Sequence, residues 1–295
     1  MIKWLKHIGQ GIGMGVAIVI PGVSGGTVAL IFGIYEELIA AAAAAVQTTL
    51  LLVRFEPRAF VSRLKQLPFG FIVPLVAGIV IVPVIGARII PEAMATWPTQ
   101  SRALFFGLIL GSLAIPWIRI NSAEVREYAL TILAALTAFV LAGFPPAEVL
   151  DPTLVQIFLA AAIAISAMLL PGVSGAFLLL VMGLYAPILR AIDARNVLVV
   201  GVFLAGSVSG LGGFSLVMRW LLREHHDQTM AVLVGLMAGS LRALWPWLGE
   251  NRGLEWYGGD GRLESVVLLF AAGLIVSVAI TVYEIRKKKS GPPAS

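Results

Sequence analysis

A Pro-Gly-Val-Ser-Gly motif occurs twice in strongly apolar sequence, and it constrains the fold more than any other feature of the chain. The motif reads PGVSGG at residues 21–26 and PGVSGA at residues 171–176. Between Pro21–Tyr35 and Pro171–Tyr185, eight of fifteen aligned residues are identical. Proline removes a backbone donor, and a freed backbone group in hydrocarbon costs several kcal/mol unless protein or water satisfies it. We therefore expect the exposed backbone of both copies to serve in binding.

The composition is that of a polytopic helical membrane protein. The 295 residues are 59% hydrophobic and 13% charged, with a mean hydropathy of +0.96. A soluble domain carries about 25% charged residues. The net charge of +5 fits basic loops, which orient membrane proteins, so we expect no nucleic-acid partner. The chain has no cysteine and no metal, nucleotide or nucleophile motif, so we expect no metal, no cofactor and no catalytic residues.

The internal repeat extends beyond the motif. GLILGSL at residues 107–113 recurs as GLMAGSL at residues 235–241, an offset of 128 residues against 150 for the motif. The first half therefore holds 22 extra residues, which we assign to a basic stretch at about 52–68. Its apolar residues Phe55, Ala59, Phe60 and Leu64 fall at helical spacing, which indicates an amphipathic helix on the membrane surface. A plain cytoplasmic loop is the alternative.

We expect an all-α polytopic membrane protein made of two inverted repeats. Each repeat contains a re-entrant broken-helix hairpin, formed around the motif, and about three transmembrane helices. Residues 1–145 form the first repeat, residues 146–285 the second, and residues 286–295 a basic cytoplasmic tail. The apolar runs predict spans at about Phe69–Ile90, Ala103–Ile118, Ala129–Phe144, Val197–Leu222, Met230–Leu248 and Val266–Tyr283.

The distribution of charge predicts the topology. If both broken segments return to the side they entered from, most basic loops and both termini are cytoplasmic. Three spans per half is an odd number, so the second half is inverted relative to the first, as in many secondary transporters. In a rival topology the broken segments cross fully, and the alanine-rich run 38–53 then supplies a further span or leaves the basic stretch outside.

The motif at the tip of a re-entrant hairpin is suited to binding an anion. A short helix starts after each copy, and its first N–H groups have no intrahelical partner. The hydroxyls of Ser24, Thr27 and Ser174 add donors, and the glycines let a ligand approach the backbone. In the alternative interpretation the motif only caps a tight turn within the membrane. The presence of two inverted copies favours the anion site.

Three charged residues are further candidates. Arg242 lies well inside a predicted span, where an arginine normally faces a polar cavity, an anion or a carboxylate. The alternative is that it extends to the outer headgroups beside Trp245 and Trp247. Glu36 and Glu37 follow the first motif and are candidates for proton coupling, or are ordinary solvated residues at the cytoplasmic interface.

The paired motifs resemble those of the PopT-type polyprenyl-phosphate translocase family. The resemblance rests on residues 21–27 with Gly33–Glu36, on residues 171–175 with Gly183–Tyr185, and on the two GLxxGSL stretches. It implies a transporter that returns undecaprenyl phosphate, the lipid carrier of envelope glycans, from the outer to the inner leaflet of the bacterial cytoplasmic membrane. It also implies a headgroup site lined by Gly22, Ser24, Gly25, Gly26, Thr27, Gly172, Ser174 and Gly175. Val23, Val173 and Arg242 complete our candidate substrate-binding set.

The chain departs from the family pattern at Ala186, where relatives often have a glutamate, so no carboxylate role is expected in the second copy. Two other functions remain open. Undecaprenyl pyrophosphate phosphatases of the bacitracin-resistance type pair similar motifs, but they carry an arginine where this chain has Gly25 and Gly175. Without that cation the main stabiliser of phosphoryl transfer is missing. The other alternative is a carrier of a small soluble anion.

Overall fold

The computed structural model describes residues 2–19, 24–86, 92, 95–249, 251–259 and 263–289. The described residues form helices and loops. The β-type pairing among them is one antiparallel bridge between Leu248 and Leu254. In the first half the helices are α1 (Ile2–Val19), α2 (Gly25–Ile31), α3 (Tyr35–Val53), α4 (Pro57–Leu64), α5 (Phe69–Gly86), α7 (Pro98–Ser112), α8 (Ala114–Trp117) and α9 (Val125–Leu141). In the second half they are α10 (Leu154–Leu169), α11 (Gly175–Val181), α12 (Tyr185–Asp193), α13 (Val197–Glu224), α14 (His226–Ser240), the 3-10 turn η1 (Leu241–Leu244) and α15 (Leu263–Lys289).

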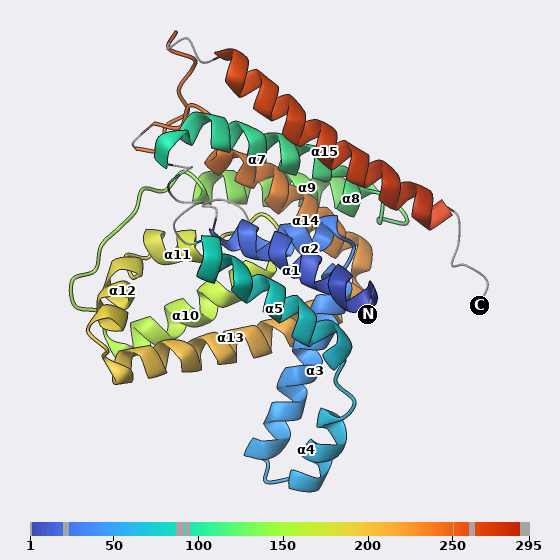
Figure 1. The fold of residues 1–295 in the computed structure, drawn as a ribbon, viewed down its shortest axis with the longest axis vertical. Helices are drawn as coiled ribbons and strands as arrows, with labels where there is room; N and C mark the ends of the chain where they lie inside the picture. Colours follow the sequence, from blue (N-terminus) through green and yellow to red (C-terminus); the bar gives the residue numbers. More distant parts are fainter. Residues whose placement is uncertain are drawn as a thin grey trace.

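The helices pack in four long pairs among the described residues, two within the halves and two between them. Within each half, the helix before the motif pairs with a later one, α1 with α5 and α10 with α13. The remaining pairs join the halves, because α7 packs against α15 and α9 packs against α14 (Figure 1). Each half therefore contributes its last long helix to the other half. The boundary at residue 145 divides the sequence, but the two halves are intertwined in space.

Glycines of the repeated GLxxGSL stretch explain how these mixed pairs approach so closely. Gly107 and Gly111 lie against the α15 backbone, and Gly235 and Gly239 lie against the α9 backbone. A side chain at Gly107, Gly235 or Gly239 would overlap a carbonyl oxygen of the facing helix, and one at Gly111 would press on the side chain of Ser277. Small residues drive helix association in membranes because they let backbones come into contact. The repeated glycines thus have the same packing role in both halves.

Each motif interrupts the chain between a long helix and a helix of seven residues. α2 begins at Gly25 and α11 begins at Gly175. Both short helices end at a glycine with positive φ, 69° at Gly33 and 74° at Gly183. In this left-handed conformation the next amide, of Ile34 or Leu184, donates back to the helix carbonyl five residues earlier, over 2.9 Å. The identical glycines of the two copies are therefore explained by the turn that each must make.

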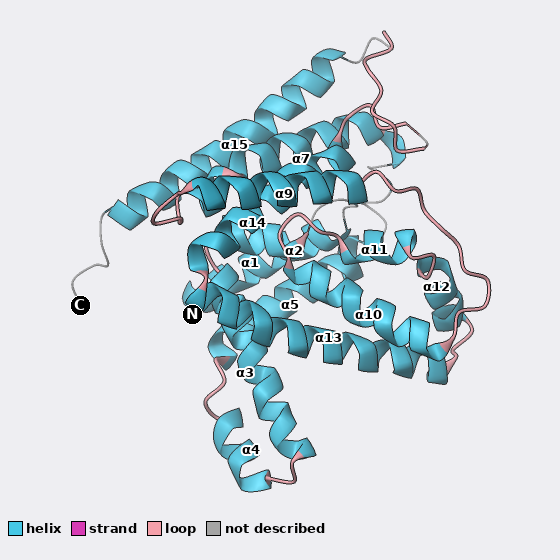
Figure 2. Ribbon diagram, turned by 180° about the vertical axis from the view of Figure 1, so that it is seen from behind, coloured by secondary structure: helices cyan, strands magenta, loops and turns pink. Residues whose placement is uncertain are grey.

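A projecting helical arm follows the first short helix and differs from our expectation. α3 forms a 19-residue helix across the alanine-rich run that the preferred topology left unassigned. The surface helix expected at 52–68 is only the eight-residue α4, with Pro57 in its first turn. Phe55 lies outside it, with φ 57° and 92% exposure, so its part in the helical spacing was wrong. α3 and α4 extend together from the body of the molecule (Figures 1 and 2).

A helix lies in the range of each of the six predicted spans, but fewer of these helices are long and apolar enough to cross a membrane. Among the described residues, α13 and the part Leu263–Val282 of α15 are long and apolar enough to cross a membrane alone. Up to four such spans result if two bent pairs each count as one, α4 with α5 at 77° and α11 with α12 at 103°. α14 ends at Ser240 and not at Leu248, because the chain turns through η1 and reaches Pro246.

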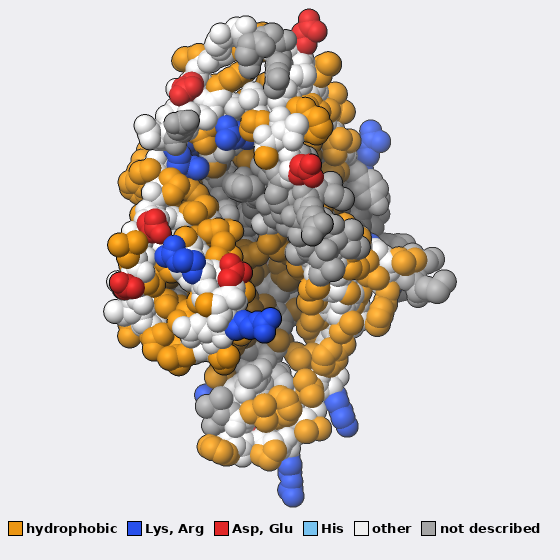
Figure 3. Space-filling model, turned by 60° about the vertical axis from the view of Figure 1, so that its left-hand side comes forward, with side chains coloured by type: hydrophobic (Ala, Val, Ile, Leu, Met, Phe, Trp, Pro, Cys, Tyr) orange, Lys and Arg blue, Asp and Glu red, His pale blue; other side chains and the backbone are white. Residues whose placement is uncertain are grey.

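The surface of the described chain is strongly apolar, as a lipid-facing surface must be. Exposed large hydrophobic side chains lie along α9, α13 and α15, among them Ile132, Leu133, Leu204, Val208, Leu268 and Ile275. Figure 3 shows one face on which hydrophobic side chains cover much of the surface and charged side chains are few. Exposed apolar area of this extent is rare on soluble monomers. The molecule is an all-helical membrane protein.

Candidate functional site

The two motifs, 150 residues apart in sequence, are joined by direct hydrogen bonds. Ser24 is 1% exposed, and its Oγ lies 3.1 Å from the carbonyl oxygen of Met168 and 3.0 Å from that of Leu170, both acceptors at the end of α10. Thr27 is fully buried, and its Oγ1 accepts a 2.8 Å hydrogen bond from the amide of Gly172. Side chains at the first motif therefore satisfy backbone groups that are left without helical partners where the chain breaks at the second motif.

Both serines also cap the short helices that follow them. Ser24 Oγ accepts from the amide of Gly26 over 3.1 Å, and Ser174 Oγ accepts from the amide of Phe177 over 3.3 Å. Each cap satisfies one of the donors that a helix N-terminus leaves free. The capping role that the sequence offered as an alternative is thus present in both copies. It leaves other amides of the first turn without an intrahelical partner.

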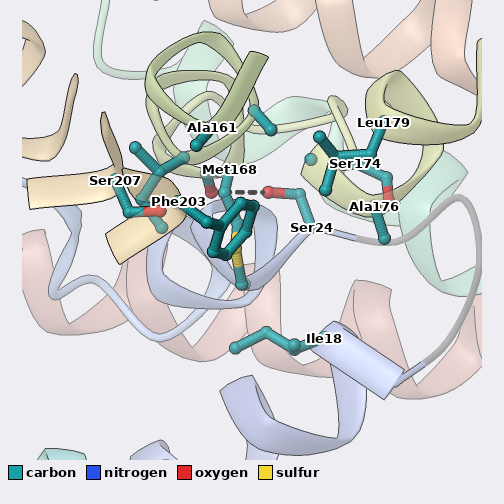
Figure 4. Close-up of a pocket in the computed structure, with 13 residues that line it drawn as sticks. Ile18, Ser24, Ala161, Met168, Ser174, Ala176, Leu179, Phe203 and Ser207 are labelled. Carbon is teal, nitrogen blue, oxygen red and sulfur yellow. Dashed lines mark hydrogen bonds between the residues drawn. The ribbon is translucent and has the colours of Figure 1, made fainter. Parts of the chain in front are cut away.

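A cavity of about 230 Å³ lies between the two motifs (Figure 4). Ser24 and Gly25 line it from the first copy, and Ser174, Gly175 and Ala176 line it from the second. Figure 4 shows Ser24 between Met168 and Ser174, with its hydrogen bond to Met168 drawn. The remaining wall residues come from the helices around the motifs: Ile18, Ala161, Ala164, Ile165, Met168, Leu179, Phe203 and Ser207. Serine hydroxyls are therefore the polar side chains in an otherwise apolar cavity.

A second, smaller cavity of about 50 Å³ lies on the other side of the second motif. Gly172, Val173, Ser174 and Phe177 line it together with residues of α9, α14 and η1. Ser174 lines both cavities, so it forms part of the wall between them. Gly172 has φ 83°, and a Cβ there would lie 2.7 Å from the carbonyl oxygen of Leu236. Only glycine fits this position without strain.

The remaining first-motif candidates are distributed differently. Gly22 and Val23 lie outside the described residues. Gly26 and Thr27 line neither cavity. A Cβ at Gly26 would lie 2.6 Å from the carbonyl oxygen of Leu169, so this glycine permits contact between the motif and α10. The first copy is therefore mostly engaged in packing, and Ser24 and Gly25 are its described residues that reach the cavity.

Arg242 is not in the middle of a span, contrary to our expectation. It lies in η1, just beyond the end of α14. Its Nη1 donates to the carbonyl of Phe139 over 3.2 Å and its Nη2 to the carbonyl of Arg252 over 3.3 Å. The guanidinium also stacks 4.6 Å from the ring centroid of Phe139, and its buried Nε has no hydrogen-bond partner. Arg242 thus caps a carbonyl group near the C-terminus of α9, and its Nε remains without a hydrogen-bond partner among the described residues.

Glu36 and Glu37 lie at the surface, at the start of α3. Glu36 Oε1 is 3.4 Å from Arg119 Nη1 and 3.9 Å from His226 Nε2, and its side chain is 53% exposed. Neither glutamate lines either of the cavities beside the motifs. The structure therefore separates these carboxylates from the serines that the sequence grouped with them.

Two further arginines lie in this region: Arg252 was not a sequence candidate, and Arg102 was interpreted as an interface anchor that could still supply a charge to a headgroup. The guanidinium of Arg252 lies 4.3 Å from the ring centroid of Phe177, the residue whose amide Ser174 caps. Arg102 donates to the carbonyl of Leu248 over 3.3 Å, in the same loop region. Arg252 lies in a polar stretch that reads as an ordinary outer loop, and Arg102 reads as an anchor at a span end. Contacts between residues this far apart in sequence leave no local signal.

Comparisons with known proteins agree on one family. The family model described as undecaprenyl phosphate translocase-like matches residues 14–256. A polyprenyl-phosphate transporter of Vibrio cholerae serotype O1 is 37% identical over 246 residues, which cover 83% of this chain and 79% of that protein. A polyprenyl-phosphate transporter of Staphylococcus aureus is 29% identical over 308 aligned positions, covering 94% of this chain and 96% of that protein. No solved structure matches the chain.

Proposed function

The chain belongs to the undecaprenyl phosphate translocase-like family, and on this basis we propose that it returns undecaprenyl phosphate from the outer to the inner leaflet of the bacterial cytoplasmic membrane. It is a transporter of polyprenyl phosphate and not an enzyme. Transfer of the charged phosphate group of this lipid from water into hydrocarbon is strongly unfavourable. The protein must therefore replace the hydration of that group with fixed hydrogen-bond donors.

The observation that carries this proposal is the meeting of both motifs at one cavity. Ser24 and Ser174 face the same space of about 230 Å³, although they belong to opposite halves of the chain. Free amides at the first turns of α2 and α11 supply further donors of fixed orientation. In our proposal the phosphate lies between these turns, held by the Ser174 hydroxyl and by backbone N–H groups of Gly25, Gly175 and Ala176, while the Ser24 hydroxyl stays bonded to α10.

The prenyl tail has an apolar route beside the headgroup site. A cavity of about 480 Å³ lies between α9, α13 and α14, and Leu170, the residue before the second motif, also lines it. Its walls are mainly leucine, valine, phenylalanine and methionine, and Arg126, His225 and Gln228 also line it. In our proposal the first isoprene units occupy this space, and the rest of the tail stays in lipid.

We propose the two halves as inverted repeats with re-entrant segments at α1–α2 and α10–α11. The matched helix pairs, α1 with α5 and α10 with α13, support a repeat of this kind. The start of α1 and the end of α15 lie on one side of the molecule, while the loop between α9 and α10 lies on the other (Figure 1). With that first side facing the cytoplasm, the topology agrees with the positive-inside tendency.

In this proposal Glu36 and Glu37 are the residues that couple transport to protons. The second copy has Ala186 and Pro187 at the equivalent positions, so a carboxylate is available in one half only. Glu36 already interacts with Arg119 and His226, which are the groups that would sense a change in its charge. Replacing Glu36 by Gln should weaken the pH dependence of transport without changing headgroup binding.

The proposal is tested in proteoliposomes that contain undecaprenyl phosphate. A phosphate-binding antibiotic added outside reports the phosphate groups exposed on the outer leaflet. We expect the purified protein to accelerate their exchange between leaflets at least about tenfold over protein-free vesicles, and Ser174→Ala to remove most of that acceleration. Removing a charge-assisted hydrogen bond costs about 1.5–3 kcal/mol, roughly a 10- to 100-fold loss.

The matched control is Ser209→Ala, a serine on α13 that lines neither of the cavities beside the motifs. It should transport like the parent protein. Exchange no faster with protein than without it would contradict the transport function. Release of inorganic phosphate from the pyrophosphate lipid would instead restore the phosphatase alternative.

A further inference from the structure

Three arginines gather where α7, η1 and the following loop meet the end of α9. Arg242 and Arg252 are linked directly, because Arg242 Nη2 donates to the carbonyl of Arg252. Burial lowers the pKa of Arg252, and the positive charges of Arg102 and Arg242 lower it further. Like charges this close repel each other, and in a partly buried site that repulsion is weakly screened. The protein therefore holds three cations together at a cost.

The carboxylate of Glu255, in the same loop, lies against Gly249 and forms no ion pair with these arginines among the described residues. None of the three arginines forms an ion pair there, whereas Arg119 and Arg190 at other surfaces do. Their hydrogen bonds go to carbonyl oxygens of Leu248, Phe139, Ala142 and Arg252. Among the described residues, the buried Nε of Arg242 has no hydrogen-bond partner. Arginines with available donors bind anions through strong charge-assisted hydrogen bonds.

The loop backbone is strained in a way that directs one of these arginines inward. Arg252 has φ 57°, a left-handed conformation that costs a non-glycine residue roughly 1–2 kcal/mol. Its amide donates to Gly249 over 2.9 Å, and its Nε donates to the carbonyl of Ala142 over 2.8 Å. A glycine at position 252 would adopt this conformation without strain, as the neighbouring Gly253 could. The arginine at this position is therefore explained by its side chain and not by the backbone.

The cluster borders the second motif. Arg252 stacks on Phe177, which lines the cavity of about 50 Å³ together with Gly172 and Ser174. Ala142, which accepts from Arg252, and Ala243, the neighbour of Arg242, line the same cavity. An anion at the arginines is therefore one small cavity away from Ser174. Because Ser174 also faces the larger cavity, the three sites form a series.

The position of the cluster runs against the usual distribution of basic residues. In the topology proposed above, α7 begins, and α9 and α14 end, at the outer side of the membrane, away from the start of α1 and the end of α15 (Figure 1). Basic residues are depleted on that side of membrane proteins. The positive-inside tendency therefore does not account for three arginines on this side of the membrane, whereas binding of an anion does.

We propose that Arg102, Arg242 and Arg252 form an outward-facing capture site that binds the phosphate monoester of the lipid before it passes to the paired motifs. This inference rests on the proposed transport function and adds a binding step to it. The group recognised is a phosphate monoester, so inorganic phosphate shares the chemistry and the prenyl chain distinguishes the lipid. Arginine suits this role because its guanidinium offers paired donors to phosphate oxygens.

The test is equilibrium binding to the full-length protein in detergent, with a soluble short-chain prenyl phosphate and inorganic phosphate as separate probes. We expect Arg252→Gln and Arg242→Gln each to weaken prenyl phosphate binding about 10-fold or more, the loss of a charge-assisted hydrogen bond. Inorganic phosphate should bind more weakly and lose affinity by a similar factor. Arg190→Gln is the matched control, because Arg190 is paired with Glu148 over 3.1 Å, and it should bind like the parent protein.

A purely structural role makes a different prediction. Arg242 and Arg252 both donate to carbonyls at the end of α9, so their loss also lowers thermal stability. Arg102→Gln avoids this, because among the described residues Arg102 bonds only to Leu248, and it should weaken binding with little change in stability. Unchanged affinity in all three variants, with the parent protein binding prenyl phosphate, would overturn the capture site alone. A parent protein that binds neither probe would contradict the transport function, and one that binds only inorganic phosphate would make the ligand a soluble anion.

Discussion

The two copies of the motif begin with the same five residues and have different surroundings. In the first copy Ser24 is 1% exposed, Thr27 is fully buried, and Tyr35 is fully buried with its hydroxyl unpartnered. In the second copy Ser174 lines two cavities, and Tyr185 is 37% exposed. The first copy is buried and forms hydrogen bonds to the other half of the chain. The second copy, which we call the open copy, borders both cavities.

The difference follows from the residues that the copies do not share. Thr27 provides a hydroxyl that satisfies Gly172, and its counterpart Phe177 provides a ring on which Arg252 stacks. Gly26 allows contact with α10, and its counterpart Ala176 faces the cavity. A repeated motif in an intertwined pair of halves can thus divide structural and binding roles. The following four predictions test that division.

The largest effect is expected from Gly172→Ala, which should disrupt the open copy. The position has φ 83°, and its Cβ would meet the backbone of Leu236 and Met237 at 2.7 Å. Left-handed strain and overpacking together should lower the free energy of unfolding by about 2–5 kcal/mol. Gly201→Ala is the control, since nothing lies within 4 Å of that position. Denaturant titration of both variants in detergent measures the difference, and equal stability would refute the backbone constraint.

Exchanging the residues at one position between the copies should be asymmetric. Gly26→Ala places a methyl group 2.6 Å from the carbonyl oxygen of Leu169, so we expect a loss of about 1–3 kcal/mol. Ala176→Gly removes a methyl from the cavity wall and should cost about 1 kcal/mol or less. The same titration compares them. If both substitutions cost the same, the copies are packed alike and the division fails.

The two serines should separate stability from binding. Ser24→Ala removes a cap and the bond across to α10 in a buried site, so stability should fall by about 1–3 kcal/mol. Ser174→Ala removes a half-buried cap, worth about 0.5–2 kcal/mol, but it should weaken prenyl phosphate binding more than Ser24→Ala does. Thermal unfolding and binding are measured on each variant. The reverse order in either measurement would exchange the roles assigned to the copies.

The smallest effect on stability is expected at the charges that follow the first copy. Glu36→Gln removes an exposed interaction with Arg119, and exposed ion pairs contribute about 0–1 kcal/mol. We expect the free energy of unfolding to change by no more than that. Transport measured between pH 5 and pH 8 then shows whether the carboxylate carries protons. A pH profile identical to that of the parent protein would exclude Glu36 from coupling.

The intertwining of the halves was not accessible from the sequence, although the repeat was. Hydrophobic runs and the offsets of 150 and 128 residues indicated the helices and their order. Which helices pair depends on contacts between distant faces, and an apolar run looks the same whichever neighbour it meets. The projecting helix α3 was missed for a related reason: its alanine-rich sequence has a weak preference for either lipid or protein.

The sequence alone determined an all-helical membrane protein with two short helices that start at repeated serines, because caps, breakers and apolar length act locally. The tertiary structure alone decided which copy is buried, where Arg242 lies, and that Arg102 and Arg252 join it near Ser174. Burial and charge clustering depend on side chains that arrive from remote parts of the chain. No local pattern encodes that arrival.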